Sequence, residues 1–288
     1  MDLTALSGAA TIALASTIIL LLVIRSWAAF AKSTTTTRFP ESIMLEAAQR
    51  IRDKLAKLSH DQSVYLVSAL VFVVVFCIFY LIPPQGMFDD VPRWQLILVL
   101  VLLGIAATFL IYQIVQTVIA KRKLLFYRDA SMATGHALQK LTANQNRVFH
   151  DVATAAGTID NVIVGLQGVY TVSVIARKAG RNDRATLNGD RLSFGEKHAI
   201  SVKRSATQSE QLAKEIRKVT GNDIRVRSVI AIPGWEIESQ QSSEFLVVNE
   251  RNLAMLTGWK DQKDYLMNED VESVQKLLTK RCTRFARK

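Results

Sequence analysis

Three long stretches without a charged side chain constrain this chain more than any other feature. They run over Leu3–Ile24 (22 residues), Gln62–Phe88 (27 residues) and Trp94–Ala120 (27 residues). Each is longer than the roughly 18 apolar residues that cross a hydrocarbon core about 30 Å thick. Lipid offers no hydrogen-bond partner to the backbone, so each stretch must form a helix to enter a membrane. We therefore expect membrane-spanning helices at about 3–24, 64–82 and 95–120.

The first apolar stretch has the wrong flank for a cleaved signal peptide. Residues Met1–Gly8 contain no Lys or Arg, whereas a signal peptide begins with a positively charged region. We therefore expect the first stretch to be retained as an anchor, which makes residues 1–123 a three-helix transmembrane anchor.

Lys and Arg residues near the ends of the spans predict the orientation, because they are enriched in cytoplasmic loops. The second and third spans are joined by a loop with Arg93 alone beside Asp89 and Asp90, whereas the basic run Lys121–Lys123 follows the third span. Seven basic residues follow the first span: Arg25, Lys32, Arg38, Arg50, Arg52, Lys54 and Lys57. This distribution predicts an amino terminus outside and a carboxyl-terminal domain in the cytosol.

The loop after the first span contains a basic amphipathic pattern at about 41–58. It follows the polar run Ser33–Thr37 and places Met44, Ala47, Ala48, Ile51, Leu55 and Leu58 on one side of a helix. Such a helix can lie flat in an anionic headgroup layer. It can equally pack on the protein's own soluble domain, and the pattern does not separate the two.

Residues 124–288 have the pattern of a mixed α/β domain. Helices are expected at 124–141, 207–219, about 253–259 and 269–281, and strands at 147–152, 159–165, 169–175, 224–232 and 244–248. Asn188-Gly189 predicts a tight hairpin turn, since both residues tolerate the positive φ angles that such a turn needs. From Lys121 onward the chain has 28 Lys and Arg against 18 Asp and Glu, a net charge of +10. That excess suits a phosphate-rich partner or an anionic lipid surface.

Several common sites are not supported by the sequence. Cys77 and Cys282 are too few and too far apart for a disulfide framework or a thiolate metal site. The four histidines form no HExxH pattern, and no glycine-rich phosphate loop or GxSxG nucleophile motif occurs. Zinc hydrolysis, nucleotide binding of the P-loop type and serine-hydrolase chemistry are therefore not expected.

The segment Gly157–Gly165, followed by Gly168-Val169-Tyr170, resembles the central motif of the nuclease-related domain (NERD) family. Gly135 upstream, Gln208 at the start of the next helix and the segment Ile230–Trp235 agree with that family in order and spacing. The resemblance covers about 135–259. It implies a PD-(D/E)XK fold, so the fold class we expect is α/β, a transmembrane anchor plus a restriction-endonuclease-like mixed sheet flanked by helices.

The resemblance also implies a set of site residues, and this set is incomplete. The family pattern needs an Asp on one strand and a Glu and a Lys two residues apart on the next, to hold a divalent metal and to activate water. Asp160 takes the first position, but Ser173 and Ile175 stand at the other two, and His136 stands where the family usually has a further Glu. A hydroxyl is a poor ligand for a hard cation, and Ile carries no charge.

We therefore expect a degenerate nuclease site that is inactive or weak, with Asp160 as a structural acceptor and no bound cofactor. The alternative is an active nuclease that uses Mg²⁺ or Mn²⁺ on Asp160 and His136 with a migrated acid such as Asp190 or Glu196. The expected nucleic-acid contacts, to DNA or RNA, are Arg177, Lys178, Arg181, Arg184 and Gln208. Another alternative is a membrane scaffold for a protein partner. The family's distribution and the short loops predict the inner (cytoplasmic) membrane as the location.

Overall fold

The computed structural model describes residues 3–34, 43–81, 93–141, 146–178, 183–195, 198–242, 244–257, 259 and 264–284. The chain divides into two compact units. The membrane unit contains residues 1–37, 54–123 and 288, and the globular unit contains residues 38–53 and 124–287. This division differs from the expected boundary at residue 123, because the described residues 43–53 belong to the globular unit.

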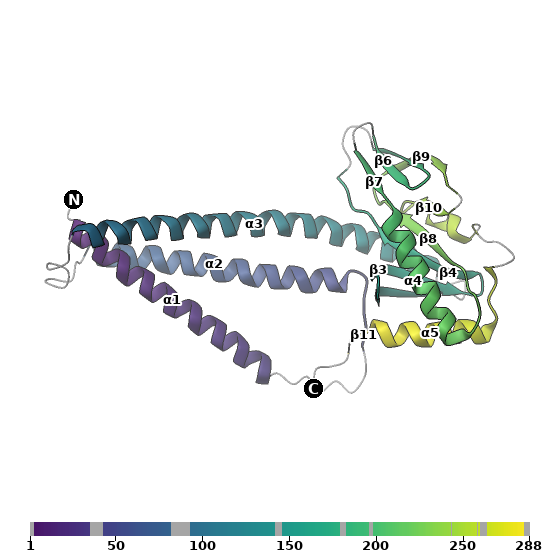
Figure 1. The fold of residues 1–288 in the computed structure, drawn as a ribbon, viewed down its shortest axis with the longest axis horizontal. Helices are drawn as coiled ribbons and strands as arrows, with labels where there is room; N and C mark the ends of the chain where they lie inside the picture. Colours follow the sequence, from purple (N-terminus) through teal and green to yellow (C-terminus); the bar gives the residue numbers. More distant parts are fainter. Residues whose placement is uncertain are drawn as a thin grey trace. The chain divides into compact units, whose positions relative to one another are not determined.

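Three helices are long and apolar enough to span a membrane, as predicted: α1 (Leu3–Thr34), α2 (Gln49–Leu81) and α3 (Arg93–Gln139) (Figure 1). Large apolar side chains project from them into the surroundings, among them Leu22, Leu70 and Ile111, each more than 60% exposed. Such exposure suits lipid as the surrounding solvent. Within the membrane unit, the Lys121 ammonium on α3 donates a hydrogen bond to Gln62 Oε1 on α2 at 3.2 Å.

Two of these helices are longer than the sequence pattern suggested. The expected helix at 41–58 and the expected span at 64–82 belong to the single helix α2, which begins at Gln49, and residue 82 lies outside the described residues. The expected span at 95–120 and the helix at 124–141 are likewise one helix, α3. No Gly or Pro interrupts either chain segment where the two predicted pieces meet, so the i to i−4 hydrogen bonds continue.

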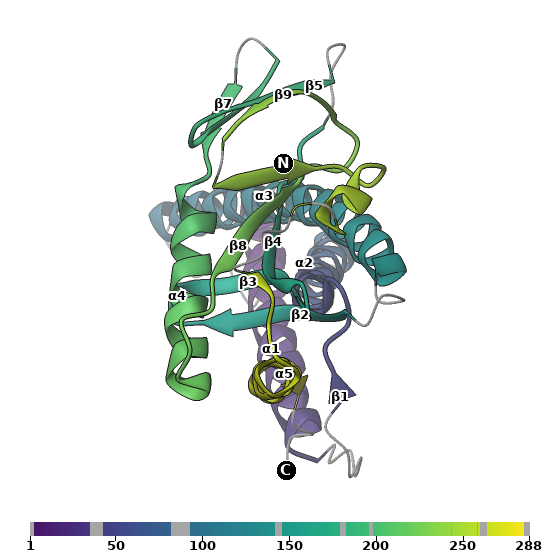
Figure 2. The same cartoon turned by 90° about the vertical axis from the view of Figure 1, so that its right-hand side faces the viewer.

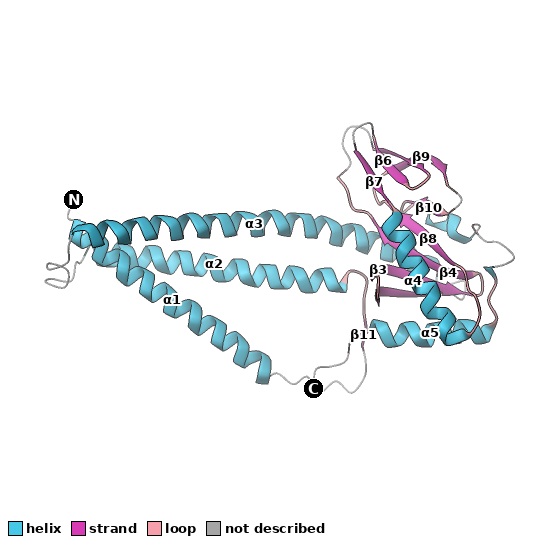
Figure 3. Ribbon diagram, viewed as in Figure 1, coloured by secondary structure: helices cyan, strands magenta, loops and turns pink. Residues whose placement is uncertain are grey.

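The globular unit is built on a mixed sheet in the strand order β10-β8-β4-β3-β2. Its strands are β2 (Arg147–Thr154), β3 (Gly157–Gly165), β4 (Gly168–Val174), β8 (Val226–Ala231) and β10 (Phe245–Val248). The first three form an antiparallel meander, and β8 and β10 run parallel to β4 (Figure 3). The structure therefore confirms all five predicted strands, with every end within two residues of its predicted position: 147–152, 159–165, 169–175, 224–232 and 244–248.

Helices cover both faces of this sheet, which makes the mixed α/β architecture three layers thick. On one face, Ala130 and Leu138 of α3 pack with Tyr170, Val172 and neighbouring strand residues. The other face is covered by α4 (Lys203–Thr220) and α5 (Asn268–Cys282), which bury the side chains Leu212, Ile216, Val274 and Leu278 (Figure 2). Gly221 ends α4 in the left-handed conformation, with φ at 76°.

A second, smaller sheet has the order β7-β6-β5-β9. Its strands are β5 (Arg184–Asn188), β6 (Arg191–Phe194), β7 (His198–Ser201) and β9 (Glu236–Gln241). The expected Asn188-Gly189 hairpin joins β5 and β6, and Gly189 has a φ of 57°. Its apolar side packs on β8 and β10 through Phe194, Trp235, Ile230 and Val247. Strands β7 and β9 were not expected from the sequence, because their side chains are mostly polar and exposed.

The segment before α2 belongs to the globular unit through short backbone contacts. Strand β1 (Ile43–Met44) pairs with β11 (Thr283–Arg284), and the Leu45 N–H donates to the Cys282 carbonyl at 2.8 Å. Ala48 and Ile51 are buried. Of the two interpretations of the basic amphipathic pattern, packing on the protein's own domain therefore describes residues 43–53.

Gly135 of α3 is needed where this segment passes. A Cβ atom built on Gly135 would lie 2.6 Å from Ala47 Cβ, well inside the contact distance of two carbon atoms. The glycine that the family resemblance singled out therefore permits a close approach of two segments of the globular unit.

Gly135→Ala should destabilise the globular unit by roughly 1–3 kcal/mol, because the new methyl group forces the 43–48 segment away from α3. Thermal unfolding of the full-length protein in detergent, followed by tryptophan fluorescence, measures the change. Gly104→Ala is the matched control, since a Cβ at that helical position meets nothing within 4 Å. Adding Ala47→Gly to the first variant should restore most of the loss. A melting temperature unchanged by Gly135→Ala alone would contradict the close approach of Gly135 and Ala47.

Candidate functional site

Asp160 lies on β3, between β2 and β4, and both of its carboxylate oxygens accept hydrogen bonds. Oδ1 accepts from the Tyr127 hydroxyl of α3 at 2.8 Å, and Oδ2 accepts from the Val174 N–H of β4 at 2.8 Å. The side chain thus ties one helix and two strands together. Burial raises the pKa of Asp160, although the two hydrogen bonds oppose that change.

A second carboxylate, Asp151, stands opposite Asp160 across the β2–β3 pair. The register pairs His150 with Asn161 and Val152 with Ile159, which leaves Asp151 facing Asp160. Asp151 has a φ of 53°, in the left-handed region that Asp tolerates better than most residues. Its Oδ2 accepts a hydrogen bond at 2.9 Å from the N–H of Arg50, in the first turn of α2. The strand residue therefore caps a helix from another part of the chain.

Arg50 supplies the positive charge next to this acidic pair. Its guanidinium donates to the Thr158 hydroxyl. Burial raises the pKa of Asp151 as well, while the N–H and the charge of Arg50 favour its ionised form. The negative charge of Asp151 also raises the pKa of Asp160. The arrangement is a partly buried acid pair held by one cation and one phenol.

Sequence reasoning identified Asp160 in this group but missed Asp151, Arg50 and Tyr127. A signal for Asp151 existed, because a tight turn at Ala155-Ala156 sets residue 151 opposite residue 160. Arg50 is separated from Asp151 by 101 residues, and no local pattern in the chain links them.

The positions where the family has Glu and Lys hold Ser173 and Ile175, which are uncharged. Ser173 pairs with Ile230 of β8 and, when the β3–β4 register is continued by one residue, stands opposite Asp160. Ile175 packs at the edge of the core around Phe194 and Trp235, and its N–H donates to the Ala231 carbonyl at 2.8 Å. Neither side chain adds a charge beside Asp160.

The other candidates for a metal site are spread over the globular unit. His136 is exposed on α3, and Asp190 in the β5–β6 turn pairs with Lys203 at 3.3 Å. Glu196 lies outside the described residues. Within the ranges that the structure describes, no three His, Cys, Asp or Glu side chains gather in one place.

The residues expected to contact nucleic acid have different surroundings. Lys178 and Arg184 are exposed, and Arg184 pairs with Glu238 at 3.3 Å. Arg177 is half-buried, with its guanidinium 5.3 Å from the centre of the Phe194 ring. Gln208 is buried on α4 and donates to the Thr158 carbonyl at 3.1 Å, which gives it a framework role. Arg181 lies outside the described residues.

The outer face of α4 carries a concentration of positive charge that the sequence analysis did not single out. Ser205, Gln208, Leu212 and Ile216 face inward. The exposed side carries Glu210 and five cations: Lys203, Arg204, Lys214, Arg217 and Lys218. Two of the five pair with exposed acids, Lys203 with Asp190 and Arg217 with Asp223 at 3.7 Å. Exposed pairs of this kind are weak, so these cations can exchange their partners for phosphate.

Comparison of the chain with protein-family models, with curated proteins and with solved structures gave no match.

Asp160→Asn should leave the fold intact, because an amide oxygen can accept from Val174 while the amide nitrogen donates to the Tyr127 oxygen. Asp160→Ala should cost about 1–3 kcal/mol, since it leaves the buried Val174 N–H without its partner. Full-length protein in detergent, unfolded at several pH values, measures both. The raised pKa of Asp160 means that its contribution is complete below about pH 3.8 and is lost as the pH rises through the folded-state pKa.

The stability of Asp160→Asn relative to wild type, measured as the free energy of unfolding, should accordingly be higher at pH 8 than at pH 4.5. Saturable stabilisation of wild type by Mg²⁺ or Mn²⁺, absent from Asp160→Asn, would instead make Asp160 a metal ligand.

Proposed function

We propose that this protein is a membrane-anchored, NERD-like domain that binds nucleic acid at the cytosolic face of the inner membrane and cuts it inefficiently or not at all. The anchor consists of three apolar helices, with the amino terminus outside. The globular unit belongs, in this proposal, to the restriction-endonuclease-like folds and keeps their framework with a degenerate site.

The strand arrangement supports the proposed fold. The family pattern requires the Asp on one strand and the Glu and Lys positions on the next. Here Asp160 lies on β3, and the positions of Ser173 and Ile175 lie on and just after β4, which pairs directly with β3. Gly135 and Gln208, two of the three other matching features, are in packed positions on α3 and α4.

The state of Asp160 carries the proposal that cleavage is weak. A carboxylate that holds a catalytic metal directs lone pairs to the cation. The metal also needs a second acidic ligand and open coordination positions for water and phosphate. Here each oxygen of Asp160 already accepts a hydrogen bond from the framework. The neighbouring acid, Asp151, is engaged by the first turn of α2. These internal hydrogen bonds support a structural role for Asp160 over a role as a metal ligand.

The charge of the domain supports the binding half of the proposal. The excess of +10 over residues 121–288 provides the long-range attraction for a polyanion. Lys178 and Arg184 expose two of the predicted phosphate contacts, and the outer face of α4 adds a row of cations at helical spacing. Contacts to phosphate do not depend on base sequence, so we expect little sequence preference.

Binding of labelled DNA and RNA to the full-length protein, in a zwitterionic detergent at several salt concentrations, tests this proposal. We expect affinity to fall steeply with salt, and the slope of log K against log salt to decrease by about 0.9 for each duplex phosphate contact removed. Lys178→Gln/Arg184→Gln and Lys214→Gln/Lys218→Gln test the two surfaces separately. Arg251→Gln/Lys276→Gln, which removes two exposed charges elsewhere, is the matched control.

A binding constant insensitive to salt, or an equal loss in all three double variants, would contradict a defined phosphate surface. No binding to either nucleic acid would favour the scaffold for a protein partner.

Incubation of the same protein with duplex and single-stranded DNA in Mg²⁺ or Mn²⁺ tests the catalytic half. We expect no metal-dependent cleavage above the background of a mock purification, because the acid and the Lys of the pattern are replaced. Metal-dependent cleavage by wild type that disappears in Asp160→Asn would establish an active nuclease. Cleavage that persists in this variant would identify a contaminating enzyme.

A further inference from the structure

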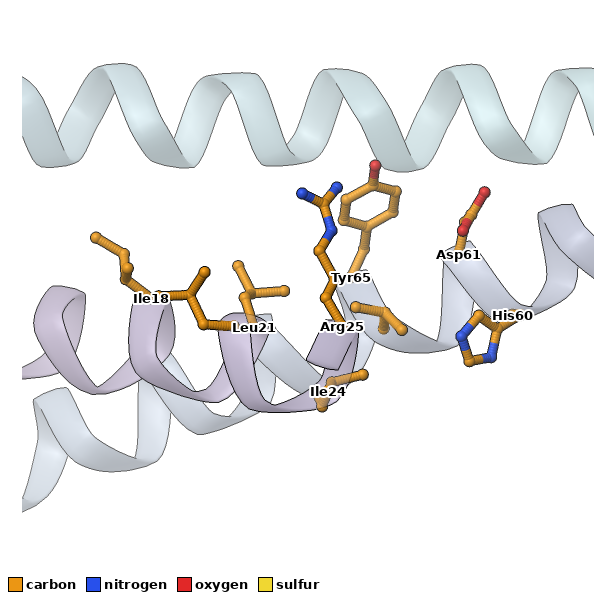
Figure 4. Close-up of a pocket in the computed structure, with 9 residues that line it drawn as sticks. Ile18, Leu21, Ile24, Arg25, His60, Asp61 and Tyr65 are labelled. Atoms are coloured by element: carbon orange, nitrogen blue, oxygen red, sulfur yellow. The ribbon is translucent and has the colours of Figure 1, made fainter. Parts of the chain in front are cut away.

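A pocket in the membrane unit lies between α1 and α2 and has two chemically different parts (Figure 4). Its apolar part consists of Ile18, Leu21, Leu22, Ile24 and Val64. Its polar part consists of Arg25, His60, Asp61 and Tyr65. The cavity has a volume of about 240 Å³, which is small for a whole lipid but sufficient for a headgroup and the first part of an acyl chain.

The polar part stands at one end of two apolar stretches. Arg25 is the first charge after the uncharged residues 3–24, and Asp61 is the last charge before the uncharged residues 62–88. A charged residue at such a boundary is at the depth of the lipid headgroups. The apolar residues of the pocket precede Arg25 on α1 and follow Asp61 on α2, on the side of the hydrocarbon.

Arg25 and Asp61 carry opposite charges in one pocket but do not pair with each other. Within the described part of the chain, neither side chain has a salt bridge or a hydrogen bond. Arg25, Asp61 and Tyr65 point the same way in Figure 4, whereas His60 points away from them. Ionised side chains next to the hydrocarbon are costly unless a partner compensates them. A ligand with one negative and one positive group compensates both.

We propose that this pocket binds an aminophospholipid with an ethanolamine headgroup. The phosphate accepts hydrogen bonds from the Arg25 guanidinium, whose planar fork suits two phosphate oxygens. The primary ammonium donates to the Asp61 carboxylate, and Tyr65 presents a hydroxyl on the same side. One acyl chain follows the apolar side chains Ile18, Leu22 and Val64.

The same chemistry discriminates against other common lipids. A choline headgroup has the same charges, but its quaternary nitrogen has no N–H to donate to Asp61. A glycerol headgroup leaves Asp61 without a cation and adds a net negative charge beside it. The predicted order of affinity is therefore ethanolamine, then choline, then glycerol.

Native mass spectrometry of the full-length protein in detergent, titrated with the three lipids carrying identical acyl chains, tests this proposal. We expect the ethanolamine lipid to bind about tenfold more tightly than the choline lipid, which corresponds to the gain from one charge-assisted hydrogen bond. Asp61→Asn should remove this preference, and Arg25→Gln should weaken binding of all three lipids. Asp61→Glu, which keeps the charge, should retain the preference.

Lys57→Gln on the exposed side of α2 and Asp129→Asn on α3 are matched charge controls outside the pocket and should change nothing. Equal melting temperatures of the variants exclude unfolding as the cause, and Asp61→Glu provides the result if Asp61→Asn does not fold. Equal affinity for the ethanolamine and glycerol lipids, or a preference unaffected by Asp61→Asn, would overturn the proposal.

Discussion

The hydrogen bonds of Asp160 are the interaction on which the globular unit depends. The Asp160 carboxylate accepts one hydrogen bond from Tyr127 on α3 and one from the Val174 N–H on β4. The neighbouring carboxylate of Asp151 accepts a hydrogen bond from the Arg50 N–H in the first turn of α2. Because both acids are partly withdrawn from water, each lost partner leaves a polar group that water cannot fully compensate. The β2–β3 pair is thus joined both to nearby elements and, through Arg50, to a segment 101 residues away in the chain.

This junction bears on the proposal that the domain cuts nucleic acid weakly or not at all. A catalytic metal site needs acids that are free to coordinate and space for phosphate. In this protein the acids are engaged in holding the framework, while Ser173 and Ile175 provide neither a ligand nor a base. Each oxygen of Asp160 accepts a hydrogen bond that joins β3 to another element of the domain.

Charge is divided between the two units in a way that suits their surroundings. The globular unit exposes cations on α4 and at Lys178 and Arg184, where water can solvate them. The membrane unit has few charges, and those at Arg25 and Asp61 stand beside apolar side chains. The first group attracts partners at a distance, whereas the second can recognise only a group that enters the headgroup layer.

The sequence by itself determined the apolar helices, the five strands of the larger sheet and the Asn188-Gly189 hairpin, because these follow from periodicity, hydropathy and turn chemistry within a few residues. It also identified Asp160 and the loss of charge at Ser173 and Ile175. Only the tertiary structure showed that residues 43–53 join the globular unit, that α2 and α3 are continuous, and that Tyr127, Asp151 and Arg50 surround Asp160. The same holds for the juxtaposition of Arg25 and Asp61. These relations depend on which distant segments pack together, and that choice is set by the burial energy of the whole chain instead of any local pattern.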